Sequence, residues 1–417
     1  MLSRVQRFLS SFTGMSRNLQ VLCLASIVSG FGGSLLGGGL FVIFLRSLGI
    51  EMIELGAVGS LIAGLNWVLR PVAGRIADLY GRKRLILINS FGSLVSTILA
   101  IVAQHWTWLV PGWIFISLLG ILCGPAYQAF IGDATEAKNR QAAMATMDTL
   151  TSIPSLISPT LGGILATFWG IRPLFVVELI FETTSAFILL RYIEDIIPAK
   201  VAKQVESKKR LTEKLRDHLV YLKDGLHMIT RQGGRNLVAV IAIGCLWDLE
   251  APAWDYISIY FVEQQNIPYW FLGLITSVYT LSYMVTQIPI GKFADKHNRK
   301  PFIFLEAVHG MCVLSFVFIT NYYWLIPIYA ARAISGITSG NSVVALMYDV
   351  IPPKVRGTML GIIYGPIRSS TQIMGPLVCS YVWTRYGGLA VIYMVSAIKV
   401  AKGMGGIIVQ EKGLKKY

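Results

Sequence analysis

The feature that most constrains this chain is a succession of long apolar runs, each bounded by charged residues, Gly, Pro or Asn. Because a hydrocarbon core about 30 Å thick needs roughly 20 apolar residues per helix, each run is long enough to cross a bilayer. Helices are expected, since lipid offers backbone groups no partner and the runs lack the alternation of a membrane barrel. The twelve runs cover residues 19–45, 53–72, 85–104, 107–130, 141–169, 173–193, 236–262, 269–290, 301–320, 322–347, 357–383 and 388–409. The sequence therefore predicts an all-α integral membrane protein.

Composition supports this class and argues against a soluble enzyme. Hydrophobic residues make up 54% of the 417 residues and charged residues 14%, against about 25% charged residues in ordinary soluble domains. The spans leave no room for a large soluble domain. The chain has no phosphate-binding Gly-x-x-x-x-Gly-Lys-Ser/Thr loop, no paired histidines in a span and no nucleophile elbow, so we expect no catalysis, cofactor or metal. The five cysteines stand singly in apolar runs and are expected to be buried and unpaired.

The distribution of positive charge predicts the orientation of the chain. The net charge is +15, yet the only Lys or Arg residues in the alternate loops that would lie outside are Arg46, Arg172 and Arg385. Because Lys and Arg concentrate in cytoplasmic loops, this asymmetry places both termini in the cytoplasm. The charge then needs no nucleic-acid partner. We expect a multi-pass protein of the plasma membrane, a monomer whose partners are the lipid bilayer and a small-molecule substrate.

One long polar segment divides the chain. It covers residues 194–235 and separates six spans in residues 1–193 from six in residues 236–417. Leucines recur at helical spacing from Leu211 to Leu226, which indicates a basic amphipathic helix on the inner leaflet. A solvated linker joining two bundles explains the segment equally well. Either way, we expect an N-terminal six-helix bundle, a cytoplasmic linker and a C-terminal six-helix bundle.

The two halves share an internal repeat. The loop after the second span reads Gly-x-x-x-Asp-x-x-Gly-Arg-Lys from Gly74 to Lys83, and a related decapeptide, Gly291 to Lys300, follows the eighth span. An Asp and an Arg bracket the fourth inner turn in both halves. Such self-similarity indicates two halves with one orientation. The loops contribute a candidate cytoplasmic gate formed by Gly74, Asp78, Gly81, Arg82, Asp133, Arg140, Gly291, Asp295, Arg299, Asp349 and Arg356.

The duplicated decapeptide resembles the signature loop of the major facilitator superfamily, and the resemblance covers nearly the whole chain. It implies a parallel repeat of two six-helix bundles that rock about a central site and expose it alternately to each side. It also implies that Arg82 pairs with Asp133 and, by repeat, Arg299 with Asp349. Asp78 would meet the positive end of a neighbouring helix. The alternative is that these residues only fix topology.

The fifth span carries a second, partial resemblance. Its segment Ser158-Pro159-Thr160-Leu161-Gly162-Gly163 is similar to the end of a motif found in drug–proton antiporters of the same superfamily. A Pro/Gly kink packed against the opposite bundle is the alternative explanation.

Ionisable residues inside the spans are the candidates for binding substrate and protons. Each costs roughly 2.5–3.5 kcal/mol or more at mid-bilayer unless it is paired or wet. Asp248 and Asp255 are seven residues apart and so share a helical face, while Pro252 breaks the helix between them. Arg332 lies at a depth from which it reaches either acid; a buried structural cluster is the alternative. The candidates are Asp248, Glu250, Asp255, Arg332, Arg368 and Asp148.

Two other charged sets receive structural interpretations. Glu306 and Lys402 fall at similar depth near the inner side and are expected to pair. Glu178 and Glu182 share a face of the sixth span and are expected to meet a partner or lipid.

These observations predict a secondary active transporter that moves a small solute by alternating access, with protons or another ion as the coupling ion. The antiporter-like motif and the acidic seventh span favour proton-coupled export of an organic or cationic compound. Arg332 and Arg368 favour the alternative, a symporter or uniporter of an organic anion, a sugar or another metabolite. A membrane-embedded enzyme and a receptor remain as other classes, and measured solute flux separates them from a transporter.

Overall fold

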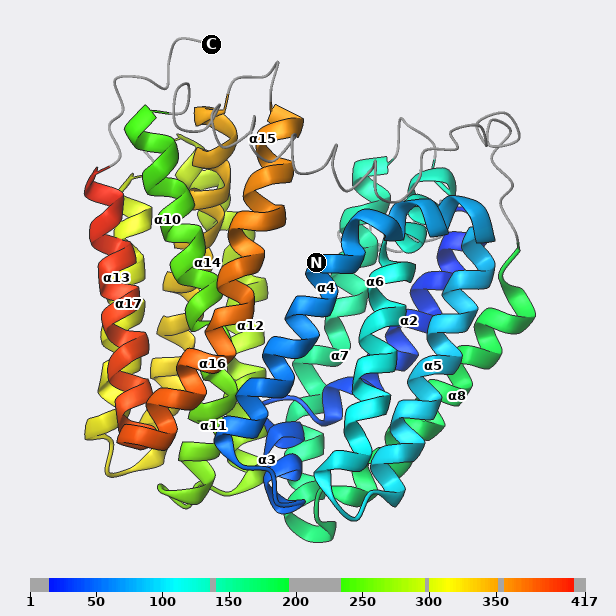
Figure 1. The fold of residues 1–417 in the computed structure, drawn as a ribbon, viewed down its shortest axis with the longest axis horizontal. Helices are drawn as coiled ribbons and strands as arrows, with labels where there is room; N and C mark the ends of the chain where they lie inside the picture. The colour runs from blue at the N-terminus through cyan, green and yellow to red at the C-terminus, as the bar shows by residue number, and fades with distance from the viewer. Residues whose placement is uncertain (1–14, 136–139, 195–233, 297–299, 352–355, 409–417) are drawn as a thin grey trace, which may run out of the picture. The chain divides into compact units, whose positions relative to one another are not determined.

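A computed structural model describes residues 15–135, 140–194, 234–296, 300–351 and 356–408, and these residues contain helices and no strand (Figure 1). In chain order the helices of the first half are α2 (Arg17–Leu35), α3 (Leu40–Ser47), α4 (Met52–Tyr80), α5 (Arg82–Val102), η1 (Trp106–Trp108), α6 (Leu109–Asp133), α7 (Arg140–Trp169) and α8 (Arg172–Tyr192). The second half contains α10 (Gly234–Glu250), α11 (Ala253–Glu263), α12 (Tyr269–Lys296), α13 (Lys300–Leu314), η3 (Ser315–Phe318), η4 (Tyr322–Trp324), α14 (Leu325–Val350), α15 (Arg356–Ile362), η6 (Ile363–Ile367), α16 (Arg368–Tyr386) and α17 (Gly388–Ile408).

Every one of the twelve predicted spans is occupied by helix, which confirms the all-α membrane class. Within the described residues, nine helices are long and apolar enough to cross a membrane. The helix at residues 303–318 is apolar but shorter. Helix α16, the last helix of the eleventh span, begins with the polar run Arg368-Ser-Ser-Thr-Gln. This run explains why α16 has a low hydropathy.

Three predicted spans are interrupted, each at glycine or proline residues. The first span divides at Gly37 to Gly39, where Gly38 and Gly39 have φ of 68° and 91°, a conformation that only glycine adopts without strain. The predicted span 19–45 is therefore formed by two helices, α2 and α3. The seventh span divides at Pro252, as predicted, because proline removes a hydrogen bond and crowds the preceding turn. The eleventh widens at Pro366 into the π-helical turn η6.

The chain forms two compact units, and each combines most of one predicted bundle with one helix end from the other. Unit 1 comprises Met1–Ile50, Val68–Val205 and Ile267–Ser277, and unit 2 comprises Glu51–Trp67, Glu206–Asn266 and Val278–Tyr417. The exchanged ends pack through small residues. In unit 2, Ser60 of α4 donates a hydrogen bond to the Ile373 carbonyl at 2.6 Å. In unit 1, Thr160 of α7 donates to Ser277 of α12 at 2.7 Å.

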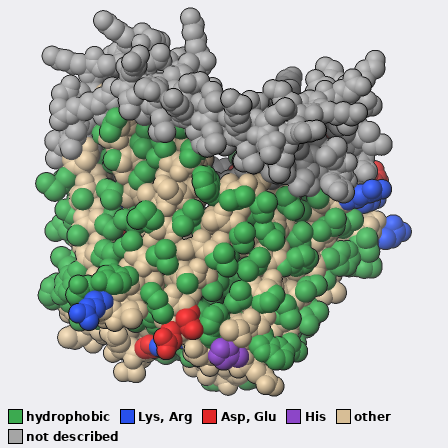
Figure 2. Space-filling view, in the orientation of Figure 1, with side chains coloured by type: hydrophobic (Ala, Val, Ile, Leu, Met, Phe, Trp, Pro, Cys, Tyr) green, Lys and Arg blue, Asp and Glu red, His purple; other side chains and the backbone are tan. Residues whose placement is uncertain are grey.

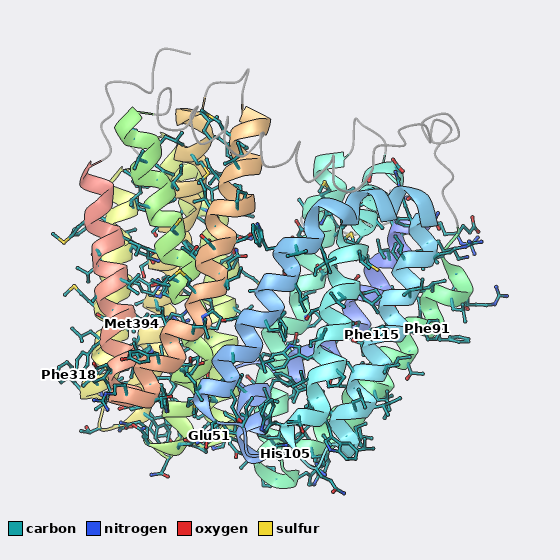
Figure 3. The ribbon with its side chains drawn as sticks, in the orientation of Figure 1. Glu51, Phe91, His105, Phe115, Phe318 and Met394 are labelled. Atoms are coloured by element: carbon teal, nitrogen blue, oxygen red, sulfur yellow. The ribbon has the colours of Figure 1, made fainter. Side chains whose placement is uncertain are left out.

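The helices of unit 1 alternate in direction, and hydrogen bonds tie the loops together at each end. At one end Trp106 donates its N–H to the Leu48 carbonyl at 3.4 Å, and Arg172 donates to the Ala103 carbonyl at 2.6 Å. Figure 3 shows His105 in this group of connections. At the opposite end the Glu194 N–H donates to the side chain of Asn18 at 2.9 Å. The first, third and fifth loops therefore meet at one end of unit 1, as alternating membrane crossings require.

Each unit has its own apolar core, and apolar side chains also cover the outer surface. The core of unit 1 joins α2, α5, α6, α7 and α8, and that of unit 2 joins α10, α13, α14 and α15. On the face shown in Figure 2, hydrophobic side chains dominate and the few charged groups lie near the ends. Phe91 and Phe115, labelled in Figure 3, are 47% and 44% exposed. Such a surface suits contact with lipid chains.

Several predictions concern parts of the chain that the structure does not describe. The proposed amphipathic helix at 211–226 lies outside the described residues. So does Arg299, and the side chains of Asp78, Arg140, Asp295, Asp349 and Arg356 are likewise outside the description.

Candidate functional site

A cavity of about 410 Å³ lies inside unit 2, among helices that Figure 1 shows gathered there. Its walls come from α10, α11, α12, α13, α14, α16 and α17. Its charged and aromatic lining consists of Trp247, Glu250, Trp254, Tyr279, Tyr283, Glu306, His309, Arg332, Arg368 and Lys399. The cavity is therefore polar on part of its wall and aromatic on the rest, as small-molecule sites commonly are.

Two carboxylates and two ammonium groups form a closed cluster at one wall. Lys399 Nζ lies 2.6 Å from Glu250 Oε1 and 3.1 Å from Glu306 Oε1. Lys402 Nζ lies 2.7 Å from each of the same two oxygens. All four side chains are at most 4% exposed. Ser339 donates a further hydrogen bond to Glu306 Oε2. The cluster is electrically balanced, which is the condition for burying four charges away from water.

Asp248 forms a second ion pair beside the cavity. Arg368 donates from Nε to Asp248 Oδ2 at 2.5 Å and from Nη2 to Oδ1 at 2.8 Å. Gln372, one turn further along α16, donates to Oδ1 at 3.3 Å. The helix break at Pro252 contributes to this contact, because α16 approaches the freed carbonyl groups: a Cβ on Gly375 would lie 2.9 Å from the Asp248 carbonyl oxygen. The guanidinium of Arg368 lines the cavity, so this pair is within reach of a bound molecule.

Arg332 lies over three aromatic rings and has no carboxylate partner among the described residues. Its guanidinium carbon lies 3.6 Å from the ring centre of Trp254, 4.5 Å from that of Tyr329 and 4.6 Å from that of Tyr279. The residue is 8% exposed, and its Nε and Nη1 groups make no hydrogen bond within the described structure.

His309 and two glycines complete the wall. The imidazole is 5% exposed, stacks on Trp254 with ring centres 6.1 Å apart, and neither nitrogen has a hydrogen-bond partner among the described residues. A Cβ on Gly336 would lie 2.7 Å from His309 Nδ1, and one on Gly340 would lie 2.6 Å from the Trp247 ring. Glycine at both positions therefore lets the two rings lie directly against α14.

Unit 1 has a smaller cavity beside two glycines of α6, Gly120 and Gly124, which lie 216 residues before Gly336 and Gly340. It measures about 280 Å³ and is lined by Gly120 and Gly124 together with the side chains of Ser26, Ser29, Asn89, Ser90, Tyr127 and Gln128. This lining contains no charged side chain. Glu182 lies nearby on α8, where Ser29 and Ser93 donate to its two oxygens at 2.6 and 2.9 Å. It is 9% exposed because α8 packs on α2 and α5. Glu182 is therefore bonded inside unit 1, and the expectation that it meets a partner or lipid is wrong for this residue.

The described part of the predicted gate agrees with the sequence. Arg82 and Asp133 form an ion pair, as expected, and Arg82 also donates to the Ala129 carbonyl at 3.0 Å. Gly81 precedes α5 with φ of 81°, a backbone conformation that glycine adopts without strain.

Two glycines of the fifth span lie directly against neighbouring backbone. A Cβ on Gly162 would meet the Leu35 carbonyl, and one on Gly163 would meet the carbonyl oxygen of Tyr269. The first residues of α12 thus lie directly on the backbone of α7 within unit 1.

The structure brings together only some of the predicted binding residues. Glu250, Arg332 and Arg368 line the unit 2 cavity, and Asp248 pairs with Arg368. The expectation that Arg332 reaches Asp248 or Asp255 is wrong. Asp255 is exposed and lines neither described cavity, whereas Asp248, on the other side of the break at residues 251–252, is buried.

Other predictions have clear outcomes. Asp148 is exposed on α7 and lines neither cavity. The pair of Glu306 and Lys402 is confirmed, but sequence reasoning left Lys399 without a role and did not join Glu250 to the pair. The available signal was that Lys399 and Lys402 lie three residues apart in a span, and so on one face of it. All five cysteines are free, as expected; Cys23, Cys123 and Cys379 are buried, while Cys245 and Cys312 are only partly buried.

A charged and aromatic cavity enclosed by membrane-spanning helices is typical of proteins that carry solutes across membranes. The family model of the Major Facilitator Superfamily matches residues 22–273 and 237–401. The chain therefore belongs to the major facilitator superfamily and is a membrane transporter.

Individual relatives agree with this assignment. The chain is 24% identical over 396 residues to the multidrug resistance protein MdtG of Proteus mirabilis, covering 92% of this chain and 93% of the relative. It is 21% identical to the class H tetracycline resistance protein of Pasteurella multocida, covering 79% of each. The crystal structure of a POT family transporter in complex with 5-aminolevulinic acid has a TM-score of 0.72 at 13% identity and covers 96% of this chain and 97% of that one, which shows the same fold.

Proposed function

We propose that this transporter exports small organic compounds from the cell in exchange for protons and binds them in the unit 2 cavity. The relatives are named for resistance to drugs and to tetracycline, which supports export. The observation that carries the proposal is the buried cluster of Glu250, Glu306, Lys399 and Lys402 at the wall of that cavity. The cluster contains two carboxylates, Glu250 and Glu306, that line the cavity and that a proton can neutralise.

Glu250 is the carboxylate best placed to exchange a proton for a compound. Its Oε1 is occupied by Lys399 and Lys402, while Oε2 is buried and has no hydrogen-bond partner among the described residues. A donor group of a bound compound can hydrogen-bond to Oε2 while Glu250 is ionised, whereas a proton on Oε2 turns that oxygen into a hydroxyl donor. The two cannot occupy it together, so each displaces the other, which is the condition for antiport.

The remaining assignments complete the proposal. Alternating access would expose the cavity to one side at a time, and the ion pair of Arg82 and Asp133 would belong to the cytoplasmic gate. Asp248 with Arg368 would respond to the bound compound, because Arg368 lines the cavity. Asp255 and Asp148 are assigned no specific part in binding substrate or protons. Both termini would lie in the cytoplasm, the protein would reside in the plasma membrane as a monomer, and the bundles would be residues 1–193 and 236–417.

The test is a solute screen in proteoliposomes that carry an imposed pH gradient, with internal pH and solute recorded together. We expect one or more organic compounds to move against their gradients while protons move in the opposite direction. The variant Glu250→Gln should lose proton-driven accumulation and retain exchange of solute for solute. Glu263→Gln, at the exposed end of α11, is the control and should behave as the parent protein.

Two results would contradict the proposal. Full proton-driven accumulation by Glu250→Gln would place the coupling group elsewhere. Movement of protons and solute in the same direction would identify a symporter, the alternative that Arg332 and Arg368 favour.

A further inference from the structure

We infer that the compound bound in the unit 2 cavity is a planar aromatic anion whose negative group is held by Arg332. This inference rests on the proposed function, in that the cavity is the substrate site, but it concerns binding and does not depend on the direction of transport or on the coupling ion.

The charge balance of the cavity leaves one positive charge over. Glu250 and Glu306 are balanced by Lys399 and Lys402, and Asp248 is balanced by Arg368. Arg332 has no acidic partner among the described residues. A single buried cation in a low-dielectric site favours a ligand of opposite charge, since the ligand completes the pairing that burial requires.

Arg332 carries the excess charge and lines the cavity. Its guanidinium lies over three aromatic rings, and these contacts offset part of its desolvation. Its Nε and Nη1 groups are buried and have no hydrogen-bond acceptor among the described residues. A carboxylate, sulfonate or phosphate arriving edge-on would accept these hydrogen bonds and pair with the charge.

His309 provides a further open donor in the same cavity. A neutral imidazole carries one N–H, and neither ring nitrogen of His309 is used by another described residue. The nearest carboxylate contact, from Nδ1 to Glu306 Oε2, is 4.0 Å and too long for a hydrogen bond. An anion near Arg332 therefore meets donors from both α13 and α14.

The rest of the cavity predicts the body of the compound. Trp247, Trp254, Tyr279 and Tyr283 contribute rings to the lining, and planar aromatic groups stack well on such surfaces. The volume of about 410 Å³ lies in the range of pockets that enclose small organic molecules. An anion at Arg332 leaves Glu250 Oε2 free for a proton or for a donor group of the same compound.

Binding of a matched naphthalene series to the purified full-length protein in detergent tests the inference. The probes are 2-naphthoate, neutral 2-naphthamide and cationic 2-naphthylmethylammonium, measured by isothermal titration calorimetry. We expect 2-naphthoate to bind at least about tenfold more tightly than the amide, which is about 1.4 kcal/mol, and the cation to bind most weakly. Arg332→Gln should remove that preference, and Arg332→Lys should restore part of it.

Controls separate this result from misfolding and from failure of the proposed function. Arg46→Gln, at the end of α3 in unit 1, should bind as the parent does, and the unfolding temperature of each variant reports its folding. If Arg332→Gln is too unstable to measure, Trp254→Leu provides the second test, since loss of the ring over Arg332 should weaken 2-naphthoate binding.

Equal binding of the acid and the amide, tighter binding of the cation, or no binding of 2-naphthoate at about 1 mM would each overturn the inference. Loss of proton exchange with anion binding intact would overturn only the proposed function.

Discussion

Removing Lys402 tests whether the four-charge cluster is balanced as the structure indicates. Its side chain is 1% exposed and its ammonium bridges Glu250 and Glu306 at 2.7 Å. In Lys402→Met the chain length is nearly kept, but the two carboxylates share Lys399 alone and one buried negative charge is left over. Breaking a buried ion pair by removing one partner costs about 3–5 kcal/mol, so we expect the variant to lose about that much free energy of unfolding.

A compensating change makes the test specific to charge. In Lys402→Met combined with Glu306→Gln, one carboxylate remains with one ammonium, and the amide still accepts the hydrogen bond from Ser339. We expect the double variant to be more stable than the sum of the single variants by about 0.5–3 kcal/mol, the usual coupling between contacting residues. Lys292→Met, on the exposed surface of α12, is the control and should change stability by at most about 0.5 kcal/mol.

The assay is denaturant unfolding in detergent micelles, followed by tryptophan fluorescence, because Trp247 and Trp254 border the cluster. The reasoning is refuted if Lys402→Met is as stable as the parent protein. It is also refuted if the losses of the two single variants simply add in the double variant.

Three further predictions concern packing, pairing and the gate. Gly163→Ala should destabilise the protein by about 1–3 kcal/mol through overpacking and should slow transport. Gly120→Ala, which has open space at its Cβ, should change neither stability nor transport. Equal unfolding temperatures of the two variants would contradict this prediction. Asp248→Asn should reduce proton-driven transport about tenfold or more, since a hydrogen bond to a charged group contributes about 1.5–3 kcal/mol. The exposed Asp255→Asn should retain the parent's rate in the same proteoliposomes, and a larger loss in Asp255→Asn would reverse the assignment. Arg82→Gln should slow transport at equal protein density. It should change stability by only about 0–1 kcal/mol, because the ion pair of Arg82 with Asp133 is partly exposed. An unchanged transport rate would mean that the pair only fixes the topology.

Local and repeated features of the sequence were sufficient to predict the architecture of the protein. The twelve apolar runs predict twelve helical spans because lipid imposes one length and one backbone geometry on any crossing. Pro252 predicts a break because the restriction is covalent and acts wherever the residue stands. The pair of Arg82 and Asp133 followed from the repeated loop, and that of Glu306 and Lys402 from equal depth in two spans.

The tertiary structure alone decided which charges meet. Depth along a span can be counted from the sequence, but the rotation of each helix about its axis cannot, because packing against neighbours and local breaks set it. Across the break at residues 251–252, Asp248 is buried and pairs with Arg368 of α16, while Asp255 is exposed. Arg332 therefore lies among aromatic rings, with no carboxylate partner in the part of the chain that the structure describes, and no spacing in the sequence encodes this result of packing.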